Sequence, residues 1–212
     1  MRNIIIFVAD GLRPDSVNPT DAPTLFNLRQ QGVNFTNSHA LFPTFTTPNA
    51  SAIATGHYLG DTGDFSNTIY AGFPVPGAAG SVTPFIENNA VLADIDEKFP
   101  GNSFLDEESL LAFARNNGYS TAAVGKLGPI LIQDVTQGNR VNGTVPPPTT
   151  IIIDDTTGKT GGVPLNADIT KALTSAGLPI VAPDRGANGT NGTNTTAGTL
   201  VSSQTKLITQ NN

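Results

Sequence analysis

The first apolar segment of the chain covers residues 4–9 and reads IIIFVA. A continuous apolar run with β-branched residues is typical of a strand that is buried on both faces of a parallel sheet. The run ends at Asp10 and Gly11, so we expect a carboxylate at the C-terminal end of this strand, where open α/β sheets bind ligands. Asp-Gly is also a common turn pair, and a turn or cap is the alternative role for Asp10.

The next segments complete a β-loop-α-β start. Residues 22–32 favour a short helix, because Leu25 and Leu28 are three positions apart and Gly32 follows. Residues 33–36 alternate between apolar and polar side chains, which predicts a strand. This order is typical of a doubly wound α/β sheet with helices on both faces.

A run of small residues then covers positions 49–56 and ends at Gly56. It predicts a tightly packed helix with a C-terminal glycine. Thr46 and Thr47 precede this run, next to Pro48. A hydroxyl at this point would lie at the positive end of the helix dipole, where anions bind.

The second half of the chain gives weaker signals. We expect an irregular loop over residues 60–80, a helix over 105–117, a strand over 120–125, a strand over 150–153 and a helix over 166–176 that ends at Gly177. Residues 188–194 are an Asn-Gly-Thr stretch with the composition of a low-complexity loop. We therefore divide the chain into residues 1–133, the N-terminal part of an α/β domain, and residues 134–212, an insertion or peripheral region of the same domain.

Three spaced segments carry a family resemblance. Residues 43–49 read PTFTTPN, Thr46 stands ten positions before Gly56 of a Thr-Gly pair, and residues 67–70 read NTIY. In this order they resemble the N-terminal half of an alkaline-phosphatase-superfamily hydrolase, closest to the type I phosphodiesterase and nucleotide pyrophosphatase branch. Three motifs in the right order are more specific than any one alone. The resemblance covers about the first 130 residues and implies an α/β three-layer sandwich with a largely parallel sheet, incomplete in this span.

The resemblance also implies a site. Thr46 would be the nucleophile that forms a phosphothreonine, and Asp10 and Thr46 would bind one of two divalent metal ions, expected to be zinc. Such ions neutralise the substrate and deprotonate a hydroxyl. Asn67 would contact the phosphoryl group. Residues 118–126 are similar to the sulfatase branch of the superfamily, in which the residue matching Lys126 contacts the substrate anion.

Each of these residues has a plainer alternative. Thr46 is also an ordinary helix cap, and Thr47 is the rival hydroxyl, although Pro48, Asn49 and the spacing to Gly56 favour Thr46. An Asn such as Asn67 in a Gly-rich loop is commonly a turn residue. A Lys that ends a strand, such as Lys126, is commonly solvated.

The predicted function is metal-dependent hydrolysis of a small phosphate ester, a phosphodiester or a nucleotide pyrophosphate. Phosphomonoesters, phosphonates, a phosphoglycerate-mutase-like transfer and a non-catalytic binding relative remain alternatives. A sulfatase is disfavoured, because that branch modifies a Cys or Ser in a C/S-x-P-x-R motif. Here Thr46 stands at the modified position and Ala50 replaces the Arg.

Composition narrows the partners. A net charge of -6 and a pI near 4.7 argue against binding a nucleic-acid duplex, which requires a basic face. The absence of Cys excludes disulfides and thiolate metal sites. No apolar run approaches the ~20 residues of a membrane span, and no signal peptide is visible at the start. The resemblance nevertheless favours a periplasmic or secreted protein, and the oligomeric state stays open.

The chain offers few nitrogen ligands for zinc. It contains only His39 and His57, and neither stands in the Asp-x-x-x-His or Asp-His arrangement of the family. We expect both to be packing or hydrogen-bonding residues. Asp154 and Asp155 follow a predicted strand in Thr-Gly surroundings, which favours a turn over a metal pair. We therefore expect the remaining metal ligands to come from sequence beyond Asn212.

Overall fold

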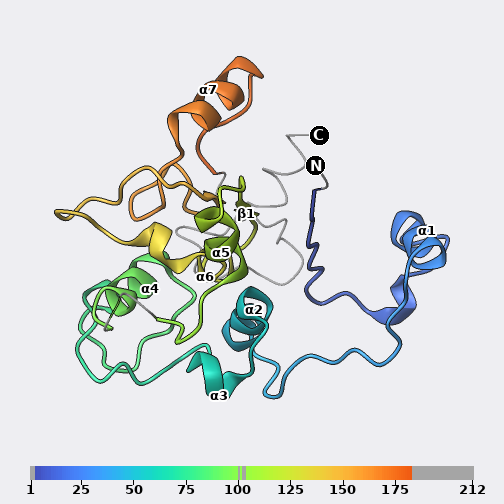
Figure 1. Ribbon diagram of the computed structural model, residues 1–212, viewed down its shortest axis with the longest axis horizontal. Coiled ribbons are helices and arrows are strands. Elements are labelled where there is room, and N and C mark those ends of the chain that lie inside the picture. The colour runs from blue at the N-terminus through green and yellow to red at the C-terminus, as the bar shows by residue number, and fades with distance from the viewer. Residues whose placement is uncertain (1–2, 100, 102–103, 183–212) are drawn as a thin grey trace. The chain divides into compact units, whose positions relative to one another are not determined.

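The computed structural model describes residues 3–99, 101 and 104–182 (Figure 1). The chain divides into two compact units, Met1–His39 and Ala40–Asn212. The low-complexity stretch at residues 188–194 lies outside the described residues. No helix of the described part is both long and apolar enough to cross a membrane.

The N-terminal unit contains a 3-10 turn, η1 (Pro14–Ser16), and helix α1 (Pro23–Gln31). Helix α1 confirms the helix predicted over residues 22–32. Pro23 stands in its first turn, and the amide of Gly32 donates to the carbonyl of Leu28 as the helix ends. Proline has no backbone N–H, and it suits the first turn of a helix because an N–H at that position has no acceptor within the helix.

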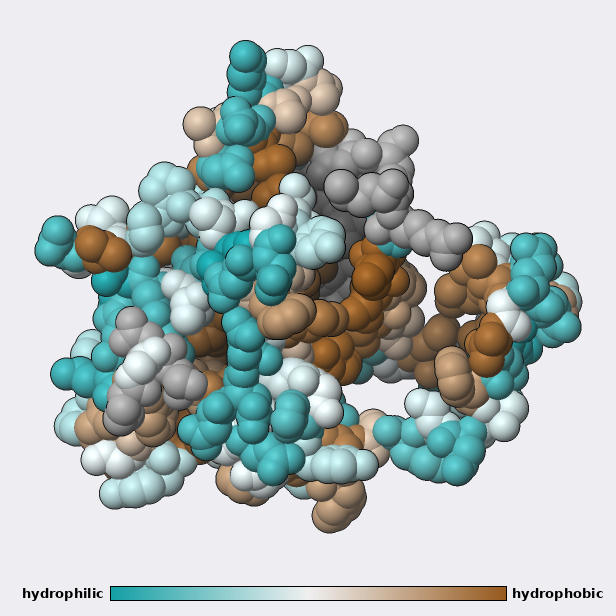
Figure 2. Space-filling view, in the orientation of Figure 1, coloured by the Kyte–Doolittle hydropathy of each residue, from teal (hydrophilic) through white to brown (hydrophobic). Residues whose placement is uncertain are grey.

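The two strands predicted in this unit are absent from the structure. Residues 3–9 form no strand, and the side chains of residues 4–8 are 58–87% exposed. In Figure 2 this run, which follows the N-terminus, is part of the brown hydrophobic surface. Residues 33–36 also form no strand, and Val33 and Phe35 are each 79% exposed. Both strand predictions are wrong for the same reason: a strand requires a hydrogen-bonded neighbour, and no described residue pairs with either segment.

The second unit holds most of the secondary structure. Its helices and 3-10 turns are α2 (Thr46–Thr55), α3 (Leu59–Thr62), η2 (Pro76–Ala78), α4 (Asn89–Asp96), α5 (Leu110–Asn116), α6 (Pro129–Ile132), η3 (Val135–Gly138) and α7 (Ala167–Ser175). Helix α2 includes the predicted small-residue run, and Gly56 follows it with φ 77°, as a C-terminal glycine does. The predicted loop over residues 60–80 is mostly irregular, with α3 and η2 as short helical turns.

Side-chain caps fix the starts of the later helices. Ser109 accepts a hydrogen bond from the amide of Ala112, so α5 begins after the acidic residues 106–108 rather than at 105. Asn166 accepts from the amide of Ile169 and caps α7, which confirms the helix predicted over residues 166–176. Its end is also as predicted, because Gly177 follows with φ 70°.

The two later strand predictions are confirmed, at shorter lengths. Strands β1 (Ala122–Val124) and β2 (Ile151–Ile153) pair in parallel, with Ala123 opposite Ile152. Two parallel strands need a crossover connection, and this one contains α6 and η3. The structure is therefore α/β with a parallel sheet, which confirms the predicted fold class and is consistent with a partial alkaline-phosphatase-like fold. The sheet has two strands among the described residues.

The core of this unit lies around α6, which contacts α2, α4 and both strands. Its largest fully buried apolar side chains come from several elements and from the loops between them: Val75, Ile86, Leu92, Ile95, Leu131, Ile132 and Ile152. The side chain of Gln133 donates to the carbonyl of Ala50, which ties the end of α6 to α2. This packing holds the start of α2 beside the loops that follow it in the chain.

Candidate functional site

The site begins at the first turn of α2. Thr46 is the first residue of the helix and is half-buried, and no side chain caps the helix at Phe45. The first backbone N–H groups of a helix lack partners within the helix and carry its positive end. Within the described part of the chain, the hydroxyl of Thr46 makes no hydrogen bond, so it is available to a ligand at this end.

Asn49 holds the loop that leads into α2. Its side-chain carbonyl accepts a 2.9 Å hydrogen bond from the amide of Leu41, and its side-chain nitrogen donates to the carbonyl of Phe45 at 2.9 Å. The same nitrogen lies 3.4 Å from the carbonyl of Pro43. One side chain thus satisfies several backbone groups of residues 41–45 and fixes the direction from which Thr46 enters the helix.

Asn67 lies against the same helix end. Its side-chain carbonyl accepts a 2.8 Å hydrogen bond from the amide of Thr47, so it satisfies one of the unpaired N–H groups of α2. Its side-chain nitrogen donates to the carboxylate of Glu87 at 3.2 Å. That nitrogen has a second hydrogen, which this bond leaves free. The structure therefore brings two of the predicted site residues, Thr46 and Asn67, together.

Lys126 reaches this group of residues through Glu87. Its ammonium forms an ion pair with the Glu87 oxygen that Asn67 does not use. The side chain of Glu87 is 8% exposed and that of Lys126 is 40% exposed, so the lysine is only partly solvated. The predicted contact of Lys126 with the substrate anion stays a prediction, and so does its plainer alternative, a solvated strand end.

Thr47 points away from solvent, toward a buried carboxylate. Its side chain is fully buried, and its hydroxyl lies 3.1 Å from the carbonyl of Ser66 and 3.3 Å from the carboxylate of Asp64. Ser51, one turn along α2, donates to the other oxygen of Asp64 at 2.7 Å. Burial raises the pKa of Asp64 from its ordinary value of 3.8 to about 6, although the hydrogen bonds from Ser51 and Thr47 oppose this rise. The hydroxyl of Thr47 is thus committed to the protein, in contrast to that of Thr46.

Asp10 belongs to the N-terminal unit, whereas Thr46 belongs to the second, so the metal ion that they are predicted to share stays a prediction. Asp10 is exposed in a turn in which the amide of Leu12 donates to the carbonyl of Ala9, and Gly11 has φ 74°. Its predicted place at the end of a buried strand is therefore wrong. Among the described residues, no three His, Asp or Glu side chains form a group that fits a metal ion. The donor set implied by the family is not assembled here, and we derive no catalytic step through a metal.

The remaining candidate ligands have ordinary partners. His39 is hydrogen-bonded to the side chain of Asn37 at 2.8 Å, and one ring nitrogen of His57 lies 3.8 Å from the carboxylates of Asp61 and Glu107. His39 is thus a hydrogen-bonding residue, as predicted, whereas the ring of His57 lies beside two carboxylates at a distance longer than a hydrogen bond. Asp154 begins a turn, also as predicted. Its side chain accepts from the amide of Thr156, and it is buried.

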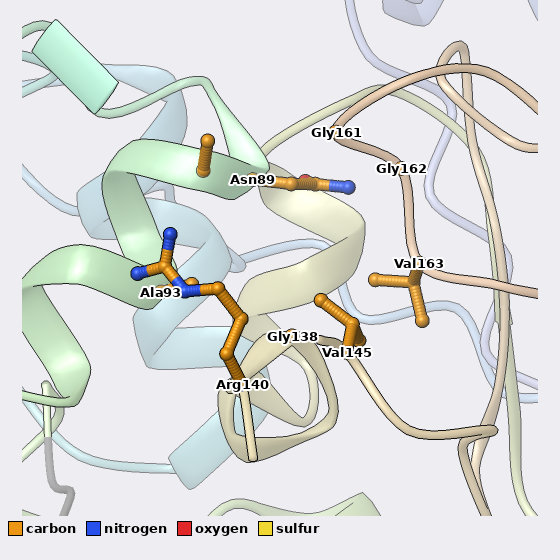
Figure 3. Close-up of a pocket in the computed structure, with 9 residues that line it drawn as sticks. Asn89, Ala93, Gly138, Arg140, Val145, Gly161, Gly162 and Val163 are labelled. Atoms are coloured by element: carbon orange, nitrogen blue, oxygen red, sulfur yellow. The ribbon is translucent and has the colours of Figure 1, made fainter. Parts of the chain in front are cut away.

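A small cavity of about 70 Å³ lies elsewhere in this unit (Figure 3). It is lined by Asn89, Ala90, Ala93, Gly138, Arg140, Val145, Gly161, Gly162 and Val163. The buried side-chain oxygen of Asn89 has no hydrogen-bond partner, but the guanidinium of Arg140 is held by Asp94 of α4 and by Glu97, the residue that follows this helix. At about 30 Å³ per water, the space suits one or two water molecules rather than a substrate. None of the predicted site residues lines it.

Sequence reasoning missed Asp64 and Glu87. Asp64 stands in a Gly-rich stretch that reads as turns, and Glu87 follows a single buried isoleucine with no periodic pattern around it. Their importance comes from contacts 13 to 39 positions away in the chain, with Thr47, Ser51, Asn67 and Lys126, and a local pattern carries no signal of such contacts.

The fold and the site together define a class: an α/β protein that presents a hydroxyl and amide donors at the start of a helix, a setting suited to an anion. Comparison with family models then gives the family. The model described as type I phosphodiesterase / nucleotide pyrophosphatase matches residues 4–202, and the chain belongs to this family. This confirms the predicted branch and supports a phosphate-ester hydrolase in general terms. Comparison with curated proteins and with solved structures gave no match.

Proposed function

We propose that the protein hydrolyses phosphodiesters or nucleotide pyrophosphates in two steps, with Thr46 as the nucleophile. The observation that carries this proposal is the contrast between the two neighbouring hydroxyls at the start of α2. Thr46 is half-buried and has no hydrogen-bond partner among the described residues, whereas Thr47 is fully buried against Asp64 and Ser66. A nucleophile must be reachable by its substrate, and only Thr46 is.

In the first step, the Thr46 oxygen forms a bond to phosphorus and the bond from phosphorus to the leaving alcohol or nucleotide group breaks. The hydroxyl proton of Thr46 passes through solvent to the leaving oxygen. In the second step, water attacks the phosphothreonine, restores the Thr46 hydroxyl and releases the phosphate product. Such covalent catalysis divides one difficult step into two easier ones.

Charge builds up on the non-bridging oxygens during both steps. The free hydrogen of the Asn67 side-chain nitrogen and the backbone amide of Thr46 are the donors available to these oxygens, because the amide of Thr47 already donates to Asn67 and Pro48 has no N–H. Because the carbonyl of Asn67 is fixed by the amide of Thr47, its orientation is set before substrate arrives. Donors that are oriented in advance stabilise the transition state most effectively.

We propose further that two divalent metal ions, zinc in the family resemblance, assist this reaction, with Asp10 and Thr46 as ligands of one of them. When bound, such ions supply charge neutralisation and an activated hydroxyl. The proposal is supported by the family membership.

The experiment is hydrolysis of bis(4-nitrophenyl) phosphate by the full-length protein. We expect Thr46→Ala to lower kcat by at least about 10³-fold, as the loss of a covalent nucleophile does. Thr46→Ser, which keeps a hydroxyl, should retain part of the activity. A chelator should abolish activity, and zinc should restore it.

Thr47→Ala is the matched control, because it removes the neighbouring hydroxyl from the same helix turn. Thr47→Ala should lower the free energy of unfolding and leave kcat close to the wild-type value. If activity survives in Thr46→Ala and is lost in Thr47→Ala, the assignment of the nucleophile is wrong. If the wild-type protein hydrolyses no phosphate ester with any divalent metal, a binding role for this member of the family replaces the proposal.

A further inference from the structure

Glu87 connects the two residues expected to contact the substrate. One carboxylate oxygen accepts a 3.2 Å hydrogen bond from Asn67, and the other pairs with Lys126. Its side chain is 8% exposed, so this negative charge is largely shielded from water. Electrostatic effects on nearby groups are stronger at such a site than at the surface.

The carboxylate is held close to the reacting end of α2. Asn67 bridges the gap, because its nitrogen donates to Glu87 while its oxygen accepts from the amide of Thr47. Glu87 is therefore two hydrogen bonds from the first turn of the helix that carries Thr46.

The lysine is also held in place. A Cβ atom on Gly128 would lie 2.6 Å from the Cα of Glu87, so the segment after Lys126 packs directly on the backbone of Glu87. On its other side, the amide of Leu127 donates to the carboxylate of Asp155 at 3.4 Å. The ion pair between Lys126 and Glu87 thus joins two segments whose backbones are already in contact.

The ion pair between Lys126 and Glu87 sets the net charge beside the proposed substrate site. The positive charge of Lys126 is matched by the negative charge of Glu87, so the pair is neutral as a whole. A phosphodiester carries one negative charge, whereas a phosphate monoester carries close to two above its second pKa of about 6. Lys126 alone would attract a dianion about twice as strongly as a monoanion, because Coulomb energies scale with charge, and the fixed carboxylate of Glu87 cancels this additional attraction.

We propose that Glu87 is a specificity-determining residue, which disfavours dianionic phosphate monoesters relative to monoanionic diesters and positions Lys126 and Asn67 for the phosphoryl group. This inference rests on the proposed function, since it concerns the substrate class accepted at the Thr46 site. It follows from the charge of the carboxylate and its hydrogen bonds. It also assigns Lys126 the opposite effect: the lysine favours dianionic monoesters relative to monoanionic diesters.

The test compares two substrates with the same leaving group at pH 8: methyl 4-nitrophenyl phosphate, a monoanion, and 4-nitrophenyl phosphate, a dianion. The measured quantity is the ratio of kcat/KM for the monoester to kcat/KM for the diester. Glu87→Gln keeps the shape of the side chain and should raise this ratio by about tenfold or more. Lys126→Met should lower it, and the double variant should return it toward the wild-type value.

Glu97→Gln is the matched control, because Glu97 is also a partly buried glutamate in an ion pair, with Arg140. It should leave the ratio unchanged. General damage to the fold would lower both activities together in every variant, and it would not move the ratio in opposite directions for Glu87→Gln and Lys126→Met. A ratio that stays constant in Glu87→Gln, or that moves in the same direction in both single variants, overturns the inference and leaves the proposed function standing.

A binding measurement separates this inference from the proposed function. If the wild-type protein hydrolyses neither ester, the proposed function fails, and the same variants are titrated calorimetrically with inorganic phosphate and with dimethyl phosphate at pH 8. Tighter binding of inorganic phosphate relative to dimethyl phosphate in Glu87→Gln, with the reverse in Lys126→Met, still supports the role of Glu87. Equal relative affinities in all variants overturn it.

Discussion

Three consecutive isoleucines occur twice in this chain, and the two copies have opposite fates. Residues 4–6 lie in the N-terminal unit, form no strand and are 58–87% exposed. Residues 151–153 form β2, pair with β1 in parallel register and bury Ile152 to 1% exposure. The three isoleucines are the same in both places, although their neighbours differ, and a paired strand is present beside only one of them among the described residues. A strand is stabilised by hydrogen bonds and packing from neighbouring segments, more than by its own propensity.

The two units as a whole also differ in how many of their residues are buried. No described residue of positions 3–39 is buried, whereas positions 40–182 contain a hydrophobic core. Hydrophobic burial is the main favourable contribution to folding. We therefore expect the stability measured by unfolding to come from the second unit. Substitutions in the first unit should have small and local effects.

The largest expected effect comes from the matched pair Ile152→Ala and Ile5→Ala. Removing a buried isoleucine side chain costs about 2–5 kcal/mol of unfolding free energy, whereas a change at an exposed position is usually within about 0.5 kcal/mol. Urea unfolding followed by circular dichroism measures both. Equal losses for the two variants would contradict the comparison, because they would show that residues 4–8 are buried in solution.

A second effect of similar size should appear at Asp64 as a function of pH. Burial raises the pKa of this carboxyl to about 6, against 3.8 ordinarily, so the folded protein holds the proton more tightly than the unfolded chain. The resulting stabilisation is present below about pH 4 and is lost as the pH rises through 6. Between pH 4 and pH 8, the wild-type protein should therefore lose about 3 kcal/mol relative to Asp64→Asn.

The measurement is denaturant unfolding of both proteins at several pH values. Asp61→Asn is the control, because Asp61 is an exposed carboxylate near Asp64 in the chain. Because its side chain is 54% exposed, Asp61→Asn should change the free energy of unfolding by less than about 0.5 kcal/mol. A constant difference between the wild type and Asp64→Asn would show that Asp64 is not buried as a carboxyl group.

The elements that the sequence predicted correctly are those with local signals. Gly56 marks the end of α2, Asn166 begins α7, and the helix over residues 23–31 has proline at its start and glycine after its end. Helix α4 was missed although its signal is present. Asn88 caps it, and Val91, Leu92 and Ile95 have helical spacing. Helix α6 is four residues of mostly apolar sequence, and such a run does not distinguish a helix from a strand.

The residues of the candidate site also divide into those with a local sequence signal and those placed by contacts that are distant in the chain. The motif order predicted Thr46 and Asn67, and the structure places both at the start of α2. Lys126 was expected from a resemblance, but its ion pair with Glu87 depends on two segments that are 39 positions apart. The buried pair of Asp64 with Thr47 is also a product of packing. Sequence patterns therefore indicated which hydroxyl and amide to consider, and the fold supplied the carboxylates that surround them.

A smaller effect is expected at Asn49, which holds residues 41–45 without belonging to the core. Asn49→Ala removes hydrogen bonds to the carbonyls of Leu41, Pro43 and Phe45 and from the amide of Leu41, and should cost about 1–3 kcal/mol of unfolding free energy. Because these bonds direct Thr46 into α2, kcat should fall by about tenfold to a hundredfold, with little change in KM. Asn117→Ala is a suitable control, since Asn117 makes one local bond to the carbonyl of Phe113 in α5. An unchanged kcat in Asn49→Ala would show that the loop is not needed to position Thr46.

The smallest effect concerns the N-terminal unit itself. The side-chain oxygen of Asn18 accepts hydrogen bonds from the amides of Thr20 and Asp21 at 2.9 and 2.8 Å, and it shapes the turn before α1. Since no described residue of this unit is buried, Asn18→Ala should change the global unfolding free energy by less than about 0.5 kcal/mol. Hydrogen exchange at Thr20 and Asp21 should nevertheless become several-fold faster, because their amides lose their acceptor and open locally. If Asn18→Ala instead speeds exchange in β2 and α4 as well, the two units unfold together, and the independence that the comparison assigns to them is wrong.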